Sequence, residues 1–291
     1  MNIQISSNSS IFRKNHSRLS RKVLPLVFLT PLLLIIFSAC SEQNRDEDQV
    51  CRIGYAIETP YVFYDDDGNL TGTEIELAKL VLDSLKIKNV EWYHTEFGLL
   101  IPELQSKRFD VIAAGMFVTP EREKEVKFSK PSFIVNQALL VPFGNPKKIF
   151  SYSDCITLNI KSAVLYSSIE EQILRKIGIA ESLLVLVPDA LTGVAAVKDG
   201  IADALALSSP TLSYVVTKQK EKQFEVINQK DKSIDFISLH KGAFAFRKDD
   251  IKNLNRWDFA LSKIVGSDSH MAILSKFGMN KNNIPNSEAD K

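Results

Sequence analysis

Two segments decide the fold: Asp110-Val-Ile-Ala-Ala-Gly-Met-Phe-Val-Thr119-Pro120 and Asp203-Ala-Leu-Ala-Leu-Ser-Ser209-Pro210. Each is typical of a buried strand that leads to a hydroxyl residue and a proline, which are preferred at the start of a helix. Two equivalent strand-to-helix turns predict two similar lobes. In open α/β sheets, ligands bind outside the carboxyl ends of the strands, which is where these turns lie.

Short apolar runs alternate with helical periodicity around these segments. Strands are expected at 53–56, 90–93, 109–114, 157–159, 183–187, 202–207 and 242–246, and helices at 74–85, 101–105, 168–176, 191–198, 251–265 and 271–277. This alternation implies crossover connections and largely parallel sheets, so the predicted fold class is α/β.

The composition is that of a globular protein, with 45% hydrophobic and 24% charged residues. Residues 1–40 hold five of the 36 basic side chains and no acidic one, which leaves 31 basic against 35 acidic side chains in the remainder. A mildly acidic body without basic clusters argues against nucleic acid as a partner.

The amino-terminal segment predicts export. A basic stretch precedes the apolar run 23–37, which is followed by Ser38, Ala39 and Cys40. The run is shorter than the roughly 20 residues that span a membrane, and its order is that of a secretory signal. We expect a signal peptide at 1–39, lipidation of Cys40 and a polar tether at 40–50. Ordinary secretion with an incidental cysteine is the alternative.

Two cysteines remain in the mature chain, Cys51 and Cys155. An exported protein can join such a pair in a disulfide. We expect the two on different lobes, where a bridge would obstruct relative motion, so two separate thiols are predicted and a bridge is the alternative.

The candidate ligand-binding residues lie at expected strand ends of the first lobe. The segments are Glu58-Thr59-Pro60-Tyr61, Glu96-Phe97-Gly98, Gly115-Met116-Phe117 and Thr119-Pro120-Glu121-Arg122. An arginine in the first turn of a helix opposes the helix dipole, and this mismatch is relieved if Arg122 binds a carboxylate. An exposed arginine paired with Glu121 or Glu125 is the alternative.

Three aromatic residues accompany this arginine. Tyr61, Phe97 and Phe117 could form an aromatic cage around an organic cation, with Glu58 as the counter-charge. Each ring alone fits a place in the hydrophobic core equally well, and Glu58 fits a surface turn. Nothing places the four histidines at metal-binding spacing with cysteines or acids, and no phosphate loop or nucleophile elbow is present, so neither metal nor cofactor is expected.

From about residue 52 to 277 the chain resembles the family 3 solute-binding proteins of bacterial polar amino acid ABC importers. The motifs are Gly72-Thr-Glu-Ile-Glu-Leu-Ala78, Phe109-Asp110-Val111, Thr119-Pro120-Glu121-Arg122 and Phe128-Ser129-Lys-Pro131. Within this family it is most similar to receptors for ectoine and hydroxyectoine, on Ile53-Gly-Tyr-Ala-Ile-Glu-Thr-Pro-Tyr61, Glu96-Phe97-Gly98, Asp110-Val-Ile-Ala-Ala-Gly-Met-Phe117 and Ala163-Val164-Leu165.

The resemblance implies a type II periplasmic binding protein fold, in which each lobe is a mainly parallel sheet flanked by helices and two strands form a hinge. It places lobe 1 at 51–141 and 240–291, lobe 2 at 142–239, and the hinge strands near 140–143 and 235–239. It also implies that Arg122 grips the ligand carboxylate, assisted by Thr119 and the backbone near Phe117.

The same resemblance bears on the ligand. Where amino-acid receptors carry an acid for the α-ammonium group, this chain has Ser208. A neutral hydroxyl cannot neutralise an ammonium, whereas aromatic rings with Glu58 suit the delocalised cation of ectoine. Ser167 and Ser168 are expected second-lobe contacts, although the ectoine receptors typically have glycine and alanine in this turn. A polar amino acid such as glutamine or arginine is the alternative ligand.

The predicted function is that of a monomeric extracytoplasmic receptor, in the periplasm or on the outer face of a membrane. Its partners would be a small zwitterionic solute, the membrane subunits of an ABC importer and, through Cys40, the membrane itself. We expect no enzymatic activity, since no second carboxylate pairs with Glu58. A periplasmic dehydratase and a sensory domain are the alternatives from other functional classes.

Overall fold

The computed structural model describes residues 50–218, 222–229 and 240–285. The predicted signal peptide, Cys40 and nearly all of the tether lie outside the described residues. So does the second predicted hinge strand, at 235–239.

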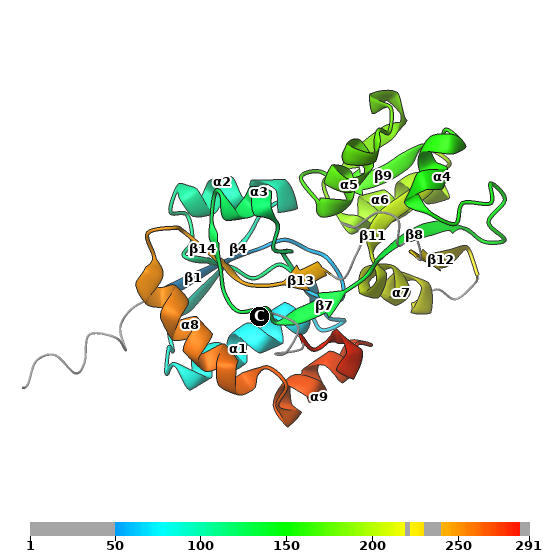
Figure 1. The fold of residues 1–291 in the computed structure, drawn as a ribbon. Helices are drawn as coiled ribbons and strands as arrows, with labels where there is room; N and C mark the ends of the chain where they lie inside the picture. Colours follow the sequence, from blue (N-terminus) through cyan, green and yellow to red (C-terminus); the bar gives the residue numbers. More distant parts are fainter. Residues whose placement is uncertain (1–49, 219–221, 230–239, 286–291) are drawn as a thin grey trace, which may run out of the picture. The chain divides into compact units, whose positions relative to one another are not determined.

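The first lobe is built on a five-stranded sheet. Its order is β4 (Val90–His94), β1 (Cys51–Tyr55), β5 (Val111–Ile112), β14 (Ala245–Phe246) and β6 (Lys127–Phe128). The first three strands are parallel, and β14 runs antiparallel to both of its neighbours. Helices α1 (Thr73–Ser84) and α8 (Ile251–Ile264) cover one face, and α2 (Leu100–Gln105) and α3 (Pro120–Glu123) lie on the other (Figure 1).

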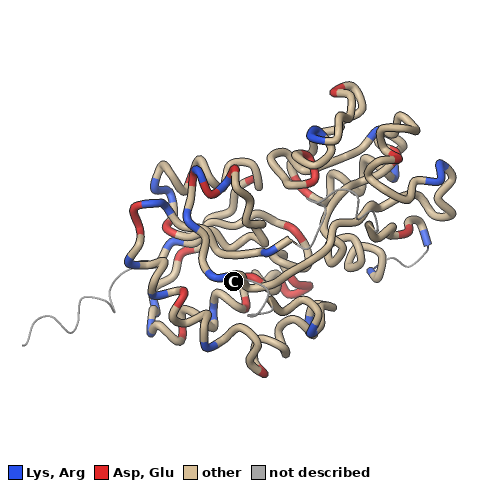
Figure 2. The backbone as a smooth tube through the Cα atoms, in the orientation of Figure 1, with Lys and Arg blue, Asp and Glu red and all other residues tan. Residues whose placement is uncertain are grey.

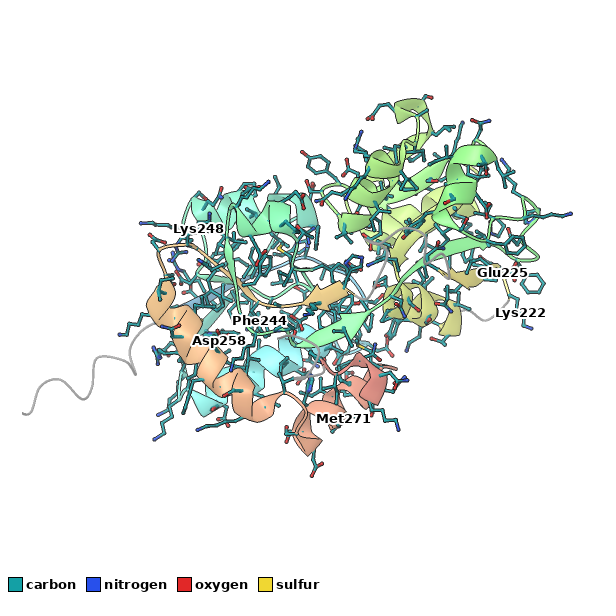
Figure 3. The ribbon with its side chains drawn as sticks, viewed as in Figure 1. Lys222, Glu225, Phe244, Lys248, Asp258 and Met271 are labelled. Carbon is teal, nitrogen blue, oxygen red and sulfur yellow. The ribbon has the colours of Figure 1, made fainter. Side chains whose placement is uncertain are left out.

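The core under α1 and α8 forms because their apolar residues recur at helical spacing and face the alternate residues of the strands. Phe244, labelled in Figure 3, packs here with its ring centroid 4.8 Å from that of Trp257. Asp258, which follows Trp257 in α8, accepts a hydrogen bond from the backbone N–H of Lys130 at 2.7 Å. These contacts hold α8 against the sheet and against the segment that follows β6.

The second lobe is built on another five-stranded sheet. Its order is β10 (Leu184–Val187), β9 (Ser162–Leu165), β11 (Ala204–Ser208), β8 (Gln137–Pro142) and β12 (Phe224–Asn228). Here β10, β9 and β11 are parallel, and β8 is antiparallel to both β11 and β12. Helices α4 (Tyr152–Thr157) and α5 (Ile169–Ile177) pack on one face, and α6 (Ala190–Lys198) and α7 (Ser209–Thr217) on the other.

Smaller elements complete the described chain. They are β2 (Phe63–Tyr64) with β3 (Leu70–Thr71), β7 (Phe133–Val135) with β13 (His240–Gly242), α9 (Asp268–Lys276), and three short 3₁₀ helices, η1 (Phe97–Leu99), η2 (Glu181–Leu183) and η4 (Lys281–Asn283). Strand β7, which pairs with β13 in the antiparallel direction, is followed directly by β8. The chain therefore passes into the second sheet at Asn136.

The predicted two-lobed α/β fold is confirmed, with three differences. Each sheet is mixed, because β14 in the first sheet and β8 in the second run antiparallel to their neighbours. Residues 157–159 are not a strand: they end α4, which begins where Ser151 caps the N–H of Asp154. The residues 140–143, predicted as a hinge strand, belong mostly to β8 inside the second sheet. The lobe limits 51–141, 142–239 and 240–291 stay a prediction.

Gly54 in β1 is required by packing. A Cβ atom at this position would lie 2.4 Å from Cζ of the buried Phe109, and β1 is held on both sides by hydrogen-bonded strands. We expect Gly54→Ala to lower the free energy of unfolding by about 1–3 kcal/mol, the usual effect of overpacking a core. Urea unfolding measures the change, with Lys88→Ala as an exposed control. A loss no larger than that of the control would contradict this packing.

Candidate functional site

Arg122 is held in place by backbone carbonyls from both lobes. It lies in α3, which begins where the Thr119 hydroxyl accepts a hydrogen bond from the N–H of Arg122 at 3.2 Å. Its Nη1 donates to the carbonyl of Phe117 at 2.8 Å, and its Nη2 donates to the carbonyl of Ser167 in the second lobe at 2.9 Å. The guanidinium carbon is 5.4 Å from the ring centroid of Phe97. The predicted alternative of an exposed arginine is wrong, because Arg122 is only 4% exposed.

This burial has an electrostatic consequence. Removal from water lowers the pKa of Arg122 to about 10, against the attraction of Glu170, Glu58 and Glu121, which raises it. The side chain is therefore charged at neutral pH. A buried guanidinium with carbonyl partners alone in its direct contacts favours a carboxylate as an additional partner.

Glu58 anchors a chain of side-chain hydrogen bonds that joins the lobes. Thr211 Oγ1 donates to Glu58 Oε1 at 2.8 Å, and Thr211 Oγ1 is 2.9 Å from Ser208 Oγ. Ser208 Oγ is in turn 2.9 Å from the hydroxyl of Tyr61. All four side chains are buried, so Glu58 is not the surface acid of the alternative interpretation.

The carboxyl group of Glu58 is held mostly protonated at neutral pH. Its pKa is raised to about 8, chiefly by burial and then by the negative charge of Glu170. The hydrogen bond from Thr211 and the charge of Arg122 act in the opposite direction. A cation placed next to Glu58 would lower this pKa and favour the ionised form.

The predicted aromatic residues fall into two contacting groups. Phe97 lies against Arg122, whereas Tyr61 stacks on Phe133 with ring centroids 4.9 Å apart and an interplanar angle of 22°. The ring of Phe117 packs edge to face with Phe133, with centroids 6.2 Å apart. Because its carbonyl also accepts from Arg122, Phe117 connects the two groups. All three predicted rings are buried, and the structure places them in the hydrophobic core.

The predicted second-lobe contacts lie in the turn between β9 and α5. Ser167 has a left-handed backbone (φ 62°) and presents its carbonyl to Arg122. The Ser168 hydroxyl caps α5 by accepting from the N–H of Glu171 at 3.2 Å. Tyr166 lies against the first lobe, where a Cβ atom on Gly98 would be 2.4 Å from its ring. Asp189 is a helix cap of α6 that accepts from the N–H of Thr192.

Three residues of this region escaped the sequence analysis: Gln137, Glu170 and Thr211. Glu170 is in an amphipathic helix, where an acid is expected on the solvated side, yet it is 3% exposed. Gln137 stands in an otherwise apolar run, and a polar residue in a buried strand was a signal that could have been used. Thr211 carried no comparable signal.

A groove of about 640 Å³ opens beside this cluster. Its lining comes from the start of α3, from α5 and from β13, and consists of Val118, Thr119, Pro120, Glu121, Ile169, Gln172, Ile173, Arg175, Lys176 and His240. Thr119 belongs both to the groove and to the turn that holds Arg122. The groove therefore connects solvent to the neighbourhood of the buried arginine.

Several other features bear on function. Within residues 50–218, 222–229 and 240–285, no three His, Cys, Asp or Glu side chains gather closely enough to hold a metal ion. In the same residues, every helix is too short or too polar to cross a membrane. Cys51 and Cys155 are free thiols.

Comparison with known proteins agrees with this geometry. The family described as bacterial extracellular solute-binding proteins, family 3, matches residues 51–280. A probable amino-acid ABC transporter periplasmic-binding protein of Sinorhizobium fredii is 31% identical over 229 residues, which are 78% of this chain and 76% of that protein.

Solved structures show the same fold. The structure of EhuB in complex with hydroxyectoine superposes with a TM-score of 0.74 at 27% identity, over 81% of this chain and 90% of that one. An ancestral arginine-binding protein bound to arginine gives a TM-score of 0.70 at 26% identity, over 80% of this chain and 99% of the other. The two-lobed type II periplasmic binding protein fold is thereby confirmed, and the chain belongs to the family 3 bacterial extracellular solute-binding proteins.

Proposed function

We propose that this chain is the extracytoplasmic receptor of an ABC importer and that it binds a small zwitterion with the ligand carboxylate on Arg122. The observation that carries the proposal is the buried guanidinium held by the carbonyls of Phe117 and Ser167, one from each lobe. A ligand that binds there contacts both lobes and so favours the closed arrangement. Thr119, Ser167 and Ser168 would then position the carboxylate-binding end.

The cationic end of the ligand is proposed to lie near Glu58. Tyr61, Phe97 and Phe117 would supply aromatic surface, and Ser208 a neutral hydroxyl. An ectoine-like zwitterion fits this set, and hydroxyectoine is what EhuB holds in its complex. A polar amino acid fits equally well: arginine is the ligand of the ancestral protein, and the Sinorhizobium relative is described as an amino-acid binding protein.

Binding without chemical change is the proposed activity. Glu58 accepts a hydrogen bond from Thr211, which in turn contacts the hydroxyl of Ser208. These contacts give Glu58 a structural role that requires no catalysis. Incubation of the protein with each ligand that it binds, followed by mass spectrometry, tests this point. Conversion of the ligand would favour the dehydratase alternative.

Export and anchoring are proposed from the sequence. Cleavage after residue 39 would leave Cys40 as a lipidated amino terminus and the following polar residues as a tether to the membrane. Positive and negative side chains are interspersed over both lobes (Figure 2), which does not favour a polyanion as partner. The proposed macromolecular partner is the set of membrane subunits of the importer, and the receptor is proposed to be a monomer. Mass spectrometry of the mature amino terminus in a bacterial host, for wild type and Cys40→Ser, tests the anchor.

A thermal-shift screen tests the proposed function. Ectoine, hydroxyectoine, ornithine and the twenty amino acids are each added at millimolar concentration. A ligand present at 100 times its Kd stabilises the folded state by about 2.7 kcal/mol, which raises the melting temperature by several degrees. We expect such a shift with at least one zwitterion and none with its carboxyl amide. The absence of any response at 10 mM, roughly ten thousand times a micromolar Kd, would contradict the proposal.

A further inference from the structure

Glu170 is a buried acid in the first turn of α5. Ile169 and Ile173 of the same helix pack into the core on one face of the second sheet. Glu170 is buried with them and is only 3% exposed. Its protein hydrogen bonds come from the Ser168 hydroxyl and from its own backbone N–H. No cation of the described residues forms an ion pair with it within 4 Å.

Glu170 belongs to the same electrostatic site as Glu58 and Arg122. Its negative charge raises the pKa of Glu58, and Arg122 lowers the pKa of both acids. Two buried carboxyl groups therefore lie within electrostatic range of one buried guanidinium. With both acids ionised, the three groups carry a net charge of −1, and an uncompensated buried charge is costly.

Gln137 adds an unfilled polar group on the same side of the second sheet. It is the first residue of β8 and pairs with Ser208 of β11, and side chains of directly opposed residues point to the same face. Ser208 uses that face to reach Tyr61. The Gln137 side chain is fully buried, yet neither its amide nitrogen nor its amide oxygen has a partner.

The same face carries Glu170. The next residue of β8, Ala138, accepts a hydrogen bond through its carbonyl from Tyr152, and the charge of Glu170 acts on the hydroxyls of Tyr152 and Tyr61. α5, which carries Glu170, packs on the face of the second sheet to which Gln137 points, and Glu170 acts electrostatically on Tyr61 and Tyr152 there. Native proteins rarely leave both polar atoms of a buried amide unpaired, so such an amide indicates a ligand group or water that completes it.

We propose that Glu170 and Gln137 form a second polar subsite, which binds a hydrogen-bond-donating cationic group of the ligand, and that the ligand is a dibasic zwitterion of net charge +1. The proposal rests on the proposed function, because it takes the ligand carboxylate to be on Arg122. One cationic group then faces Glu58 and the second faces Glu170, while the amide oxygen of Gln137 accepts from the second group. Ectoine carries a single cation and so compensates only one of the two acids.

Calorimetric titration with arginine and citrulline tests the subsite. The two amino acids have the same length and shape, but citrulline has a neutral ureido group in place of the guanidinium. Wild type is expected to bind arginine about 10- to 100-fold more tightly, which is the range for a hydrogen bond between charged groups. Glu170→Gln keeps the shape and the Ser168 contact, and its preference for arginine should fall to a few-fold.

The matched control is Glu181→Gln. Glu181 is in the same lobe, but unlike Glu170 it pairs with an arginine, Arg175, and its side chain is 71% exposed. This variant removes the same charge from the protein and should keep the full preference for arginine. Gln137→Leu, which removes the amide but keeps the volume, should weaken arginine more than citrulline.

Three outcomes separate this proposal from the one on which it rests. Tight binding of ectoine or citrulline that depends on Arg122 but not on Glu170 would overturn the dibasic ligand and leave the receptor function intact. An unchanged preference in a folded Glu170→Gln variant would do the same. If wild type binds no zwitterion at all, both proposals fall together.

Discussion

Arg122→Ala is expected to abolish ligand binding. Arg122 is 4% exposed and makes its side-chain hydrogen bonds to two backbone carbonyls, so its remaining donors face the proposed carboxylate. Truncation of one member of a buried charged pair costs roughly 2–5 kcal/mol, or about 30-fold to several thousand-fold in affinity. The Kd of a micromolar ligand would thus rise to between tens of micromolar and a few millimolar.

Titration calorimetry with a ligand found in the thermal-shift screen measures this loss. Arg122→Lys keeps the charge but not the planar fork, so it should retain only part of the affinity. Arg108→Ala, which removes an exposed arginine that pairs with Glu103, is the control and should bind as wild type does. Circular dichroism checks that each variant is folded. A folded Arg122→Ala variant with unchanged affinity would remove Arg122 from the site.

A strong pH dependence is the second large effect. The pKa of Glu58 is raised to about 8 and that of Glu170 to about 7, in both cases chiefly by burial. Each group holds its proton more firmly in the closed folded state than in water. The stabilisation that this protonation provides is therefore complete below pH 4.5 and is lost as the pH rises through the folded pKa.

The empty protein should accordingly become less stable between about pH 5 and pH 8. Within this interval each of the two acids lowers stability by up to about 1.4 kcal/mol per pH unit. Glu74 adds to the same trend, since burial raises its pKa to about 7. A rise in pH should also favour opening of the lobes, because opening returns Glu58 and Glu170 to water, where they ionise more easily.

Melting temperatures of the ligand-free protein from pH 6 to pH 9 measure this loss. Glu58→Gln keeps the acceptor for Thr211 but cannot ionise, so it should flatten the upper part of the profile. A cationic ligand should bind more tightly as the pH rises and should release protons on binding, which calorimetry detects in buffers of different ionisation enthalpy. A profile of Glu58→Gln that matches wild type would show that Glu58 is not protonated in the closed state.

The local pattern of the sequence predicted most of the fold. Helix 74–85 was expected from apolar spacing, and the structure has α1 at Thr73–Ser84. Thr119 and Pro120 were expected to start a helix, and Thr119 caps α3. The prediction of a strand at 157–159 was wrong. The Ser151 cap starts a helix in front of this segment, and that helix buries Tyr152 and Cys155.

Candidate site residues could be named from the sequence only where residue type and local position agree. Arg122 stood out as a cation at a helix start, and the aromatic residues stood out at strand ends. The local sequence indicated a surface helix for Glu170, and packing of α5 on the second sheet buries it.

The sequence by itself determined which segments become strands, helices and strand-to-helix turns, because these depend on side chains a few residues apart. Only the tertiary structure decided that Glu58 and Glu170, which are 112 residues apart in the sequence, are both buried within electrostatic range of Arg122. Burial then sets their protonation and hydrogen bonding. That dielectric environment belongs to the folded molecule and to no segment of it.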